Sequence, residues 1–265
     1  MEGGTLNLNL SPTTLTVTGD FTMKNTSAIT GSGTTRVINV TGDFFVKPSA
    51  NASIGNIFLS VAGTFSIASA ATVNLTTGIT SKTFGHFINN GTWDNTLFDV
   101  TITINGNFEN NGTFNNGTGR VTFKGATSNT VTGSAAVTTF NAIEVNKGLS
   151  TPTSTLANQL ADQNYILDVQ SKIALGSGNL FLTRGTFKLS SASSIVPFSS
   201  ANFSIPTATR LWNNGGDMNS TKSFNDWEID GTLQNSGDNE LGPRNNIGLY
   251  LILYTDGSVE KRVKH

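Results

Sequence analysis

The chain has 265 residues, of which 16 are basic and 17 acidic, and its formal net charge is −1. Charged residues make up only 12% of it, so no electrostatic footprint for nucleic acid or an anionic membrane is visible. Cysteine is absent, which excludes disulfides, thiolate metal sites and cysteine nucleophiles. No apolar run reaches the roughly 18 residues that predict a membrane span.

A glycine followed two residues later by phenylalanine recurs through the first half of the chain. The glycines stand at positions 19, 42, 63, 85 and 106, an almost constant interval, and apolar residues alternate around four of the five copies. Alternation of period two is typical of a strand with one apolar face. We therefore predict an all-β fold, a single-stranded parallel β-helix (β-solenoid) with coils of about 21–24 residues. The motifs are Gly19-Asp20-Phe21, Gly42-Asp43-Phe44, Gly63-Thr64-Phe65, Gly85-His86-Phe87 and Gly106-Asn107-Phe108.

The phenylalanines of these motifs share one inward register. We expect Phe21, Phe44, Phe65, Phe87 and Phe108 to form a continuous core ladder along the solenoid. The fourth copy departs from the pattern, because Ser81 and Thr83 stand at the apolar positions counted back from Gly85. Asn-Gly pairs such as Asn105-Gly106 and Asn116-Gly117 indicate turns where a positive φ is easily adopted.

The residues between glycine and phenylalanine form a second ladder that faces outward. It reads Asp20, Asp43, Thr64, His86 and Asn107. Two neighbouring carboxylates without a third acid are poor calcium ligands, since calcium prefers six to eight oxygens. We expect a solvated surface ladder and no metal site.

The repeat divides the chain into three parts. Residues 1–148 hold the Gly-x-Phe coils, 149–165 form an irregular insertion or loop, and 166–265 continue the solenoid to an apolar C-terminal strand. Pro152 ends any strand, and Thr155 to Asp162 are expected to form one or two helical turns. The second half follows a slightly longer and looser period, which Leu182, Ile205, Ile229 and Leu253 mark in successive coils. A strand pattern that begins at Leu6 favours a fragment of a longer solenoid.

Residues 112–148 resemble the repeats of large cell-surface proteins of Bacteroidetes. The matching pieces are Asn115-Asn116-Gly117, Val121-Thr122-Phe123, Thr130-Val131-Thr132-Gly133 and Thr138 to Asn146. The resemblance implies a right-handed parallel β-helix, export by the type IX system, and a role as a stalk or adhesive shaft at the cell surface or outside the cell. It carries no catalytic motif to transfer.

Two groups near the C-terminus qualify as weak candidate sites. Asp226, Glu228 and Asp230 alternate along one strand, and paired carboxylates about 5–10 Å apart serve glycoside hydrolysis. The neighbouring coils add no Lys, Arg or His to them. The other group is Tyr250, Ile252 and Tyr254, the outward side of a strand that is apolar on both faces. Such a strand predicts contact with another segment of a larger chain, another copy or a partner protein.

The sequence thus favours a structural or adhesive, non-enzymatic segment of a bacterial surface protein. No catalytic residue, metal or cofactor is expected, and neither is nucleic acid as a partner. Surface glycans are a further candidate partner. The alternative is a β-helical polysaccharide-binding or polysaccharide-cleaving protein that uses the acids at 226, 228 and 230.

Overall fold

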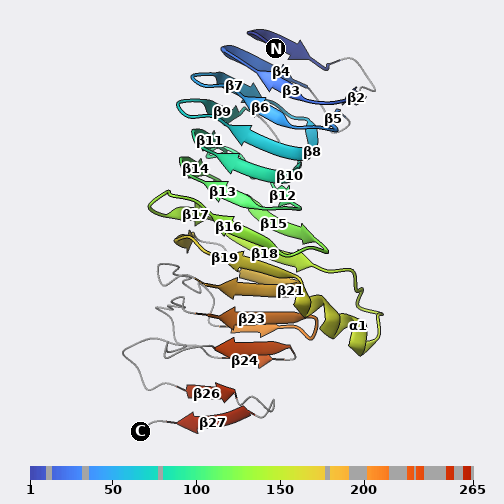
Figure 1. Ribbon diagram of the computed structural model, residues 1–265, viewed down its shortest axis with the longest axis vertical. Helices are drawn as coiled ribbons and strands as arrows, with labels where there is room; N and C mark the ends of the chain where they lie inside the picture. The colour runs from blue at the N-terminus through green and yellow to red at the C-terminus, as the bar shows by residue number, and fades with distance from the viewer. Residues whose placement is uncertain are drawn as a thin grey trace.

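The computed structural model describes residues 1–9, 14–31, 36–76, 80–176, 180–190, 202–214, 226–229, 231–235, 249–253 and 259–263. For residues 202, 203, 226–229, 233, 235, 249–253 and 259–263, it describes the backbone alone. The fold is all-β, with parallel coils stacked into a β-solenoid of about eight turns. Figure 1 shows the coils following one another from the N-terminal to the C-terminal end. None of the helices in the described ranges has the length and apolar character needed to cross a membrane.

Each coil contributes strands to three parallel rows, named here rows 1, 2 and 3. Rows 1 and 2 belong to one 15-stranded sheet, because the long strands β8 (Phe58–Ile67), β10 (Lys82–Asn89) and β21 (Leu180–Leu189) run through both. The remaining strands of row 1 are β2 (Thr14–Val17), β5 (Val37–Val40), β12 (Ile102–Ile104), β15 (Arg120–Gly125) and β18 (Ala142–Lys147). Those of row 2 are β3 (Phe21–Met23), β6 (Phe44–Val46), β13 (Phe108–Asn110), β16 (Asn129–Thr132), β19 (Ile166–Val169), β23 (Thr209–Asn213) and β25 (Thr232–Asn235).

Row 3 closes the coils on the remaining side. Its six paired strands are β1 (Gly4–Asn7), β4 (Thr26–Thr30), β7 (Asn51–Ile54), β9 (Thr72–Leu75), β11 (Thr92–Asp94) and β14 (Thr113–Asn115). The pair β17 (Thr138–Phe140) and β20 (Ile173–Leu175) follows, with β17 next to β14. Further along the chain, β22 (Asn202–Ile205) pairs in parallel with β24 (Asp226–Ile229).

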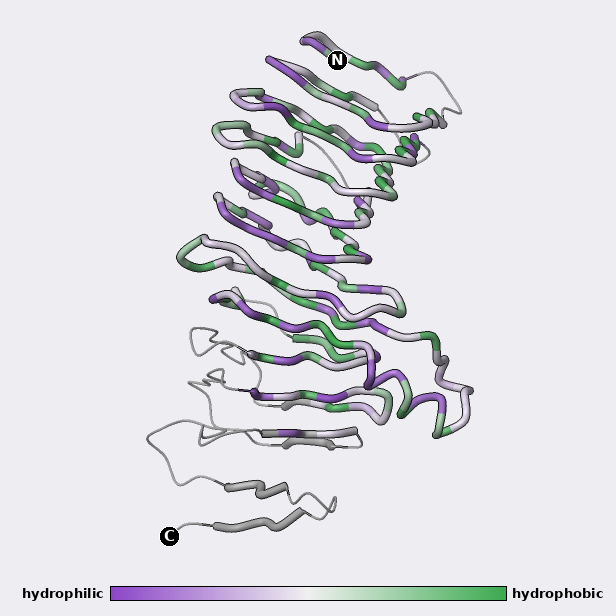
Figure 2. The backbone as a smooth tube through the Cα atoms, viewed as in Figure 1, coloured by the Kyte–Doolittle hydropathy of each residue, from purple (hydrophilic) through white to green (hydrophobic). Residues whose placement is uncertain are grey.

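The interior is filled by the inward residues of all three rows. Buried and partly exposed residues alternate along the strands, and the tube in Figure 2 changes between polar and apolar colour within the coloured coils. The motif phenylalanines stack in chain order, with ring centroids 4.9 Å apart for Phe21 and Phe44 and 4.8 Å for Phe44 and Phe65. The stack continues at 5.9 Å to Phe87 and 5.2 Å to Phe108. The shared register therefore becomes a physical column of rings.

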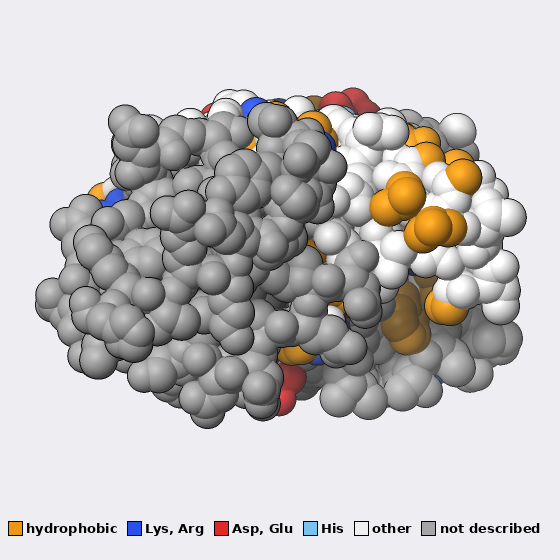
Figure 3. All heavy atoms as spheres, turned by 90° about the horizontal axis from the view of Figure 1, so that it is seen from below, with side chains coloured by type: hydrophobic (Ala, Val, Ile, Leu, Met, Phe, Trp, Pro, Cys, Tyr) orange, Lys and Arg blue, Asp and Glu red, His pale blue; other side chains and the backbone are white. Residues whose placement is uncertain are grey.

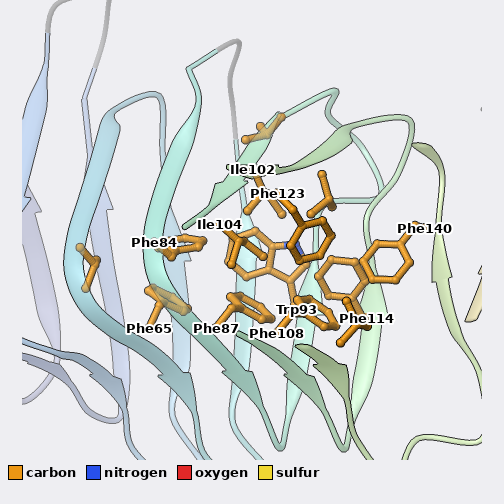
Figure 4. Close-up of a cluster of buried hydrophobic side chains, with 14 of the residues drawn as sticks. Phe65, Phe84, Phe87, Trp93, Ile102, Ile104, Phe108, Phe114, Phe123 and Phe140 are labelled. Atoms are coloured by element: carbon orange, nitrogen blue, oxygen red, sulfur yellow. The ribbon is translucent and has the colours of Figure 1, made fainter. Parts of the chain in front are cut away.

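A tryptophan from row 3 joins this column in the middle of the solenoid. Trp93 meets the rings of Phe65, Phe84 and Phe87 edge-on, at centroid distances of 5.9, 6.1 and 5.5 Å. Figure 4 shows these rings converging from neighbouring coils, with Phe114 and Phe140 beyond them. The quadrupoles of aromatic rings favour edge-to-face contacts, and these contacts connect row 3 to row 2.

The fourth coil corrects the prediction made for it. The inward residues before Gly85 are Lys82 and Phe84, both fully buried, whereas Thr83 is only partly buried. The register shifts because Val61 pairs with Phe84 while Thr64 pairs with His86, so the preceding coil holds one extra residue at this point. Counting back by twos from Gly85 therefore placed the wrong residues inward.

At the second to fifth motifs, the glycine is required by the close stacking of coils and not by positive φ. Gly19 of the first motif differs, because its φ is 108° and an added Cβ would meet nothing within 4 Å. A Cβ on Gly63 would lie 2.7 Å from the Gly42 carbonyl oxygen, and a Cβ on Gly85 would lie 2.5 Å from that of Gly63. Real Cβ atoms essentially never come under 3.0 Å. The prediction of positive φ at Asn-Gly pairs is correct at Gly117, with φ of 56°, but wrong at Gly106.

The last two strands differ from the expected continuation of parallel coils. The strand β26 (Leu249–Leu253) pairs antiparallel with β27 (Val259–Val263). A connection of five residues, 254–258, reaches an antiparallel neighbour, whereas a parallel one needs a crossover of about a dozen residues or more.

Candidate functional site

The outward ladder of the Gly-x-Phe motifs holds neighbouring coils together. Asp20 Oδ1 accepts from the Asp43 amide at 2.8 Å, and Asp43 Oδ1 accepts from the Thr64 amide at 2.7 Å. His86 Nδ1 accepts from the Asn107 amide at 3.0 Å, and Asn107 Oδ1 accepts from the Thr130 amide at 3.1 Å. These side chains satisfy backbone donors at the corner between rows 1 and 2, so their chemistry is structural.

A second ladder, of asparagines, was missed at the sequence level. The Asn89 amide nitrogen donates to Asn110 Oδ1 at 2.8 Å, and that of Asn110 donates to Thr138 Oγ1 at 2.9 Å. All three residues are buried at the corner between rows 2 and 3. The signal available was the sequence separation of Asn89 from Asn110, which equals that of Gly85 from Gly106 and hence one coil.

The acidic candidates lie only partly within the described chain. Asp226 and Glu228 are on β24, where their backbone pairs with that of Asn202 and Ser204, and Asp230 lies outside the described residues. The partner strand therefore supplies no further acid to a catalytic pair. Of the aromatic candidates, Tyr250 and Ile252 are on β26, level with Arg262 and Glu260 on β27. Tyr254 lies outside the described residues.

A chemically varied outer surface lies on row 2, on the coils that hold β19, β21, β23 and β25. The strand register aligns Asp168, Lys188, Trp212 and Gln234 on successive coils, with Arg210 beside Trp212 on β23. We call these five residues the Trp212 cluster. All five side chains are partly exposed. An indole framed by amide, carboxylate and guanidinium groups offers both an apolar plane and directed hydrogen bonds.

Electrostatic contacts hold the Trp212 cluster in place. Lys188 Nζ lies 3.5 Å from Asp168 Oδ2 and 4.6 Å from the Trp212 ring centroid. The Arg210 guanidinium lies 4.8 Å from the same centroid and donates to Gln234 Oε1 at 3.4 Å. Partial burial lowers the pKa of Arg210. Sequence reasoning missed the cluster, although Lys188, Trp212 and Gln234 recur at nearly the coil period.

The insertion at 149–165 is anchored beside this surface. It contains the helix α1 (Leu156–Ala161) and the 3-10 turn η1 (Asp162–Asn164), between β18 and β19. Buried Asp162 accepts from the Leu149 and Ser150 amides at 2.9 and 3.1 Å, and also from the Ser150 hydroxyl. The Gln163 carbonyl accepts from Arg210 at 3.2 Å, so the insertion contacts the Trp212 cluster.

The outer side of the insertion is uncharged and carries three exposed leucines. Leu149, Leu156 and Leu160 are exposed, and Asp162 is the one charged residue between 149 and 165. Figure 3, seen from the C-terminal end, shows hydrophobic side chains among uncharged atoms on the described surface.

Within the described ranges, no three His, Asp or Glu side chains gather closely enough to hold a metal ion. Comparison of the chain with protein-family models, with curated proteins and with solved structures finds no match.

Proposed function

We propose that this chain is a rigid shaft segment of a bacterial cell-surface or extracellular protein that also makes surface contacts. The observation that carries the proposal is the coupling of successive coils at three levels. Aromatic rings stack in the core, and side-chain ladders bond backbone and side chain at two corners. Because the strands of each coil pair only with those of the neighbouring coils, such a body gains length without a new core.

A mechanical role requires resistance to force along the axis. The chain has no cysteine, so Thr26→Cys on β4 and Ser204→Cys on β22 provide two unique attachment points on exposed residues. Under single-molecule pulling, we expect several coils to yield together in large extension steps. The same molecule in urea is the control. Smooth extension at forces no higher than in urea would contradict the shaft function.

The second candidate function is polysaccharide binding, favoured by the Trp212 cluster. Sugar rings stack their apolar faces on indoles and exchange hydrogen bonds with planar amide, carboxylate and guanidinium groups. A glycan array probed with the protein and with Trp212→Ala tests this. Phe45→Ala is a matched control, because Phe45 is also a partly exposed row 2 aromatic with a lysine 4.7 Å from its ring centroid.

The outcomes separate the two candidates. Binding that is lost in Trp212→Ala and kept in Phe45→Ala supports polysaccharide recognition. If the unaltered protein binds no glycan, polysaccharide binding is rejected and the shaft function remains. Reducing-sugar release that disappears in Asp226→Asn or Glu228→Gln would instead establish an enzyme, contrary to the non-enzymatic role proposed here.

A further inference from the structure

A lysine and an asparagine are buried together at the corner between rows 1 and 2. Lys147 is the last residue of β18 and is fully buried, and Asn129 is the first residue of β16, with 8% of its surface exposed. A buried amine is rare unless it is paired, because removing a charge from water is unfavourable. The reason for placing one here lies in its partners.

The strand register shows that Lys147 and Asn129 each replace a glycine of the preceding coil, at neighbouring positions. Val131 pairs with Phe108, which puts Asn129 level with Gly106, the glycine of the fifth motif. Lys147 pairs with Gly125 of the preceding coil. An amine and an amide thus occupy neighbouring interior positions where the preceding coil carries glycine.

The contacts bring the amine against the side-chain amide. Lys147 Nζ contacts Asn129 Oδ1, and it donates to the Lys124 carbonyl at 3.1 Å. Thr127 Oγ1 lies 3.4 Å from the same Asn129 oxygen, and the Asn129 amide nitrogen lies 3.5 Å from Asn107 Oδ1. The amide oxygen therefore faces two donors, while the amide nitrogen is directed the other way.

We propose that Lys147 and Asn129 join in an intramolecular isopeptide bond between Nζ and Cγ. The proposal stands independently of the function proposed above. Two reactive groups held in contact inside a folded chain gain a large effective concentration, which replaces an external coupling agent. Burial also favours the neutral amine, which is the nucleophile, because it lowers the pKa of Lys147 to about 8.

The reaction balances without any oxidant or co-reactant. The lone pair of neutral Nζ forms a bond to Asn129 Cγ, and the carbonyl electrons move to Oδ1, toward the Thr127 hydroxyl. A proton passes from Nζ to the amide nitrogen, the Cγ–Nδ2 bond breaks, and ammonia leaves as the carbonyl re-forms. The product is a secondary amide, and the chain loses one molecule of ammonia.

Lys82 provides a matched comparison within the same chain. It is also fully buried, and burial lowers its pKa to about 7. Its Nζ donates to the Ile57 carbonyl at 2.5 Å and to the Thr80 carbonyl and hydroxyl at 3.0 and 3.1 Å. These partners include no side-chain amide, so Lys82 is expected to stay free.

Mass spectrometry of the purified full chain tests the proposal. Between Lys124 and Lys172, the one Glu is Glu144 and the one further Lys or Arg is Lys147. Digestion with trypsin and a Glu-specific protease should therefore yield residues 125–144 linked to residues 145–172, lighter than their sum by one ammonia. Lys147→Met and Asn129→Ala should abolish the linked species, and Lys82→Met should retain it.

The linked peptide separates this bond from other losses of ammonia. Succinimide formation at the Asn-Gly pairs also removes ammonia, but it leaves residues 125–144 and 145–172 unconnected. Linkage that appears only after incubation at about pH 9, where the Lys147 amine is neutral, also supports the proposal. If the unaltered chain gives only unlinked peptides and cleavage after Lys147, before and after that incubation, Lys147 and Asn129 are merely hydrogen-bonded and the proposal is wrong.

Discussion

At the residue scale, burial decides what each repeated position does. Phe65 illustrates this: its fully buried ring contacts the rings of Phe44, Phe87 and Trp93 from three other strands. Phe45 stands next to a ladder ring in sequence but points outward, with Lys47 over its face. Phe44 and Phe45 are adjacent in one strand, but only the buried Phe44 is expected to contribute strongly to the free energy of unfolding.

Truncation of a central ladder ring should destabilise the solenoid strongly. Phe65→Ala removes a large buried side chain and leaves a cavity lined by neighbouring coils, so we expect a loss of about 3–5 kcal/mol. The urea midpoint measured by circular dichroism checks this. Phe45→Ala is the control and should shift the midpoint far less. Equal shifts for the two variants would contradict the inward ladder.

Lys82 should make stability depend on pH. Its folded pKa of about 7 is well below the ordinary value of 10.5, so between these values the unfolded chain binds more protons. Stability should therefore rise with pH from about 7 upward, by at most about 3 kcal/mol by pH 9.5. Urea midpoints across this range should rise less in Lys82→Met. An unchanged slope in that variant would assign the rise to other groups.

At the element scale, the close approach of coils sets which residues a strand tolerates. From Gly42 onward, the motif glycines lie against carbonyl oxygens of the preceding coil, so even a methyl group has no room. Gly176, after β20, has a different environment, because an added Cβ there would meet nothing nearer than 3.4 Å. The same residue type is thus indispensable in one place and replaceable in another.

Gly85→Ala should therefore be much more damaging than Gly176→Ala. The added Cβ at 85 would lie 2.1 Å from the Ala62 carbonyl oxygen, and relief requires moving one coil away from the next. We expect a loss of at least about 1–3 kcal/mol, measured as a thermal or urea midpoint. Gly176→Ala should be close to neutral. A tolerated Gly85→Ala would show that the coils are not held at this spacing.

At the scale of the whole molecule, the solenoid is a stack whose length follows from the number of coils. Each coil advances by about one strand spacing, roughly 4.7–4.9 Å. The insertion at 149–165 enters one coil between β18 and β19 without interrupting the parallel pairing of β18 and β19 with β21. Additional residues can therefore form either a further coil of the stack or an insertion that projects from its side.

Duplication of residues 85–105, one full period, should lengthen the stack by one coil. Spin labels on Thr26→Cys and Thr113→Cys, both exposed on row 3, report the change as a distance. We expect an increase of about 4.8 Å relative to the labelled parent, with circular dichroism unchanged in shape. An unchanged distance would mean that the added residues form a loop and that the period does not define a coil.

The sequence by itself determined the parallel β-solenoid, its coil length and the column of motif phenylalanines. These follow from local alternation and period, which the chain carries in every copy. It could not determine the inward position of Lys82 and Phe84, because the one-residue shift between β8 and β10 depends on how two coils pair. The Trp212 cluster, the antiparallel last strands and the contact of Lys147 with Asn129 were likewise decided by tertiary structure. Each of these three features brings together residues from different strands, which become neighbours only when the chain folds. The pattern within a single strand therefore does not predict them.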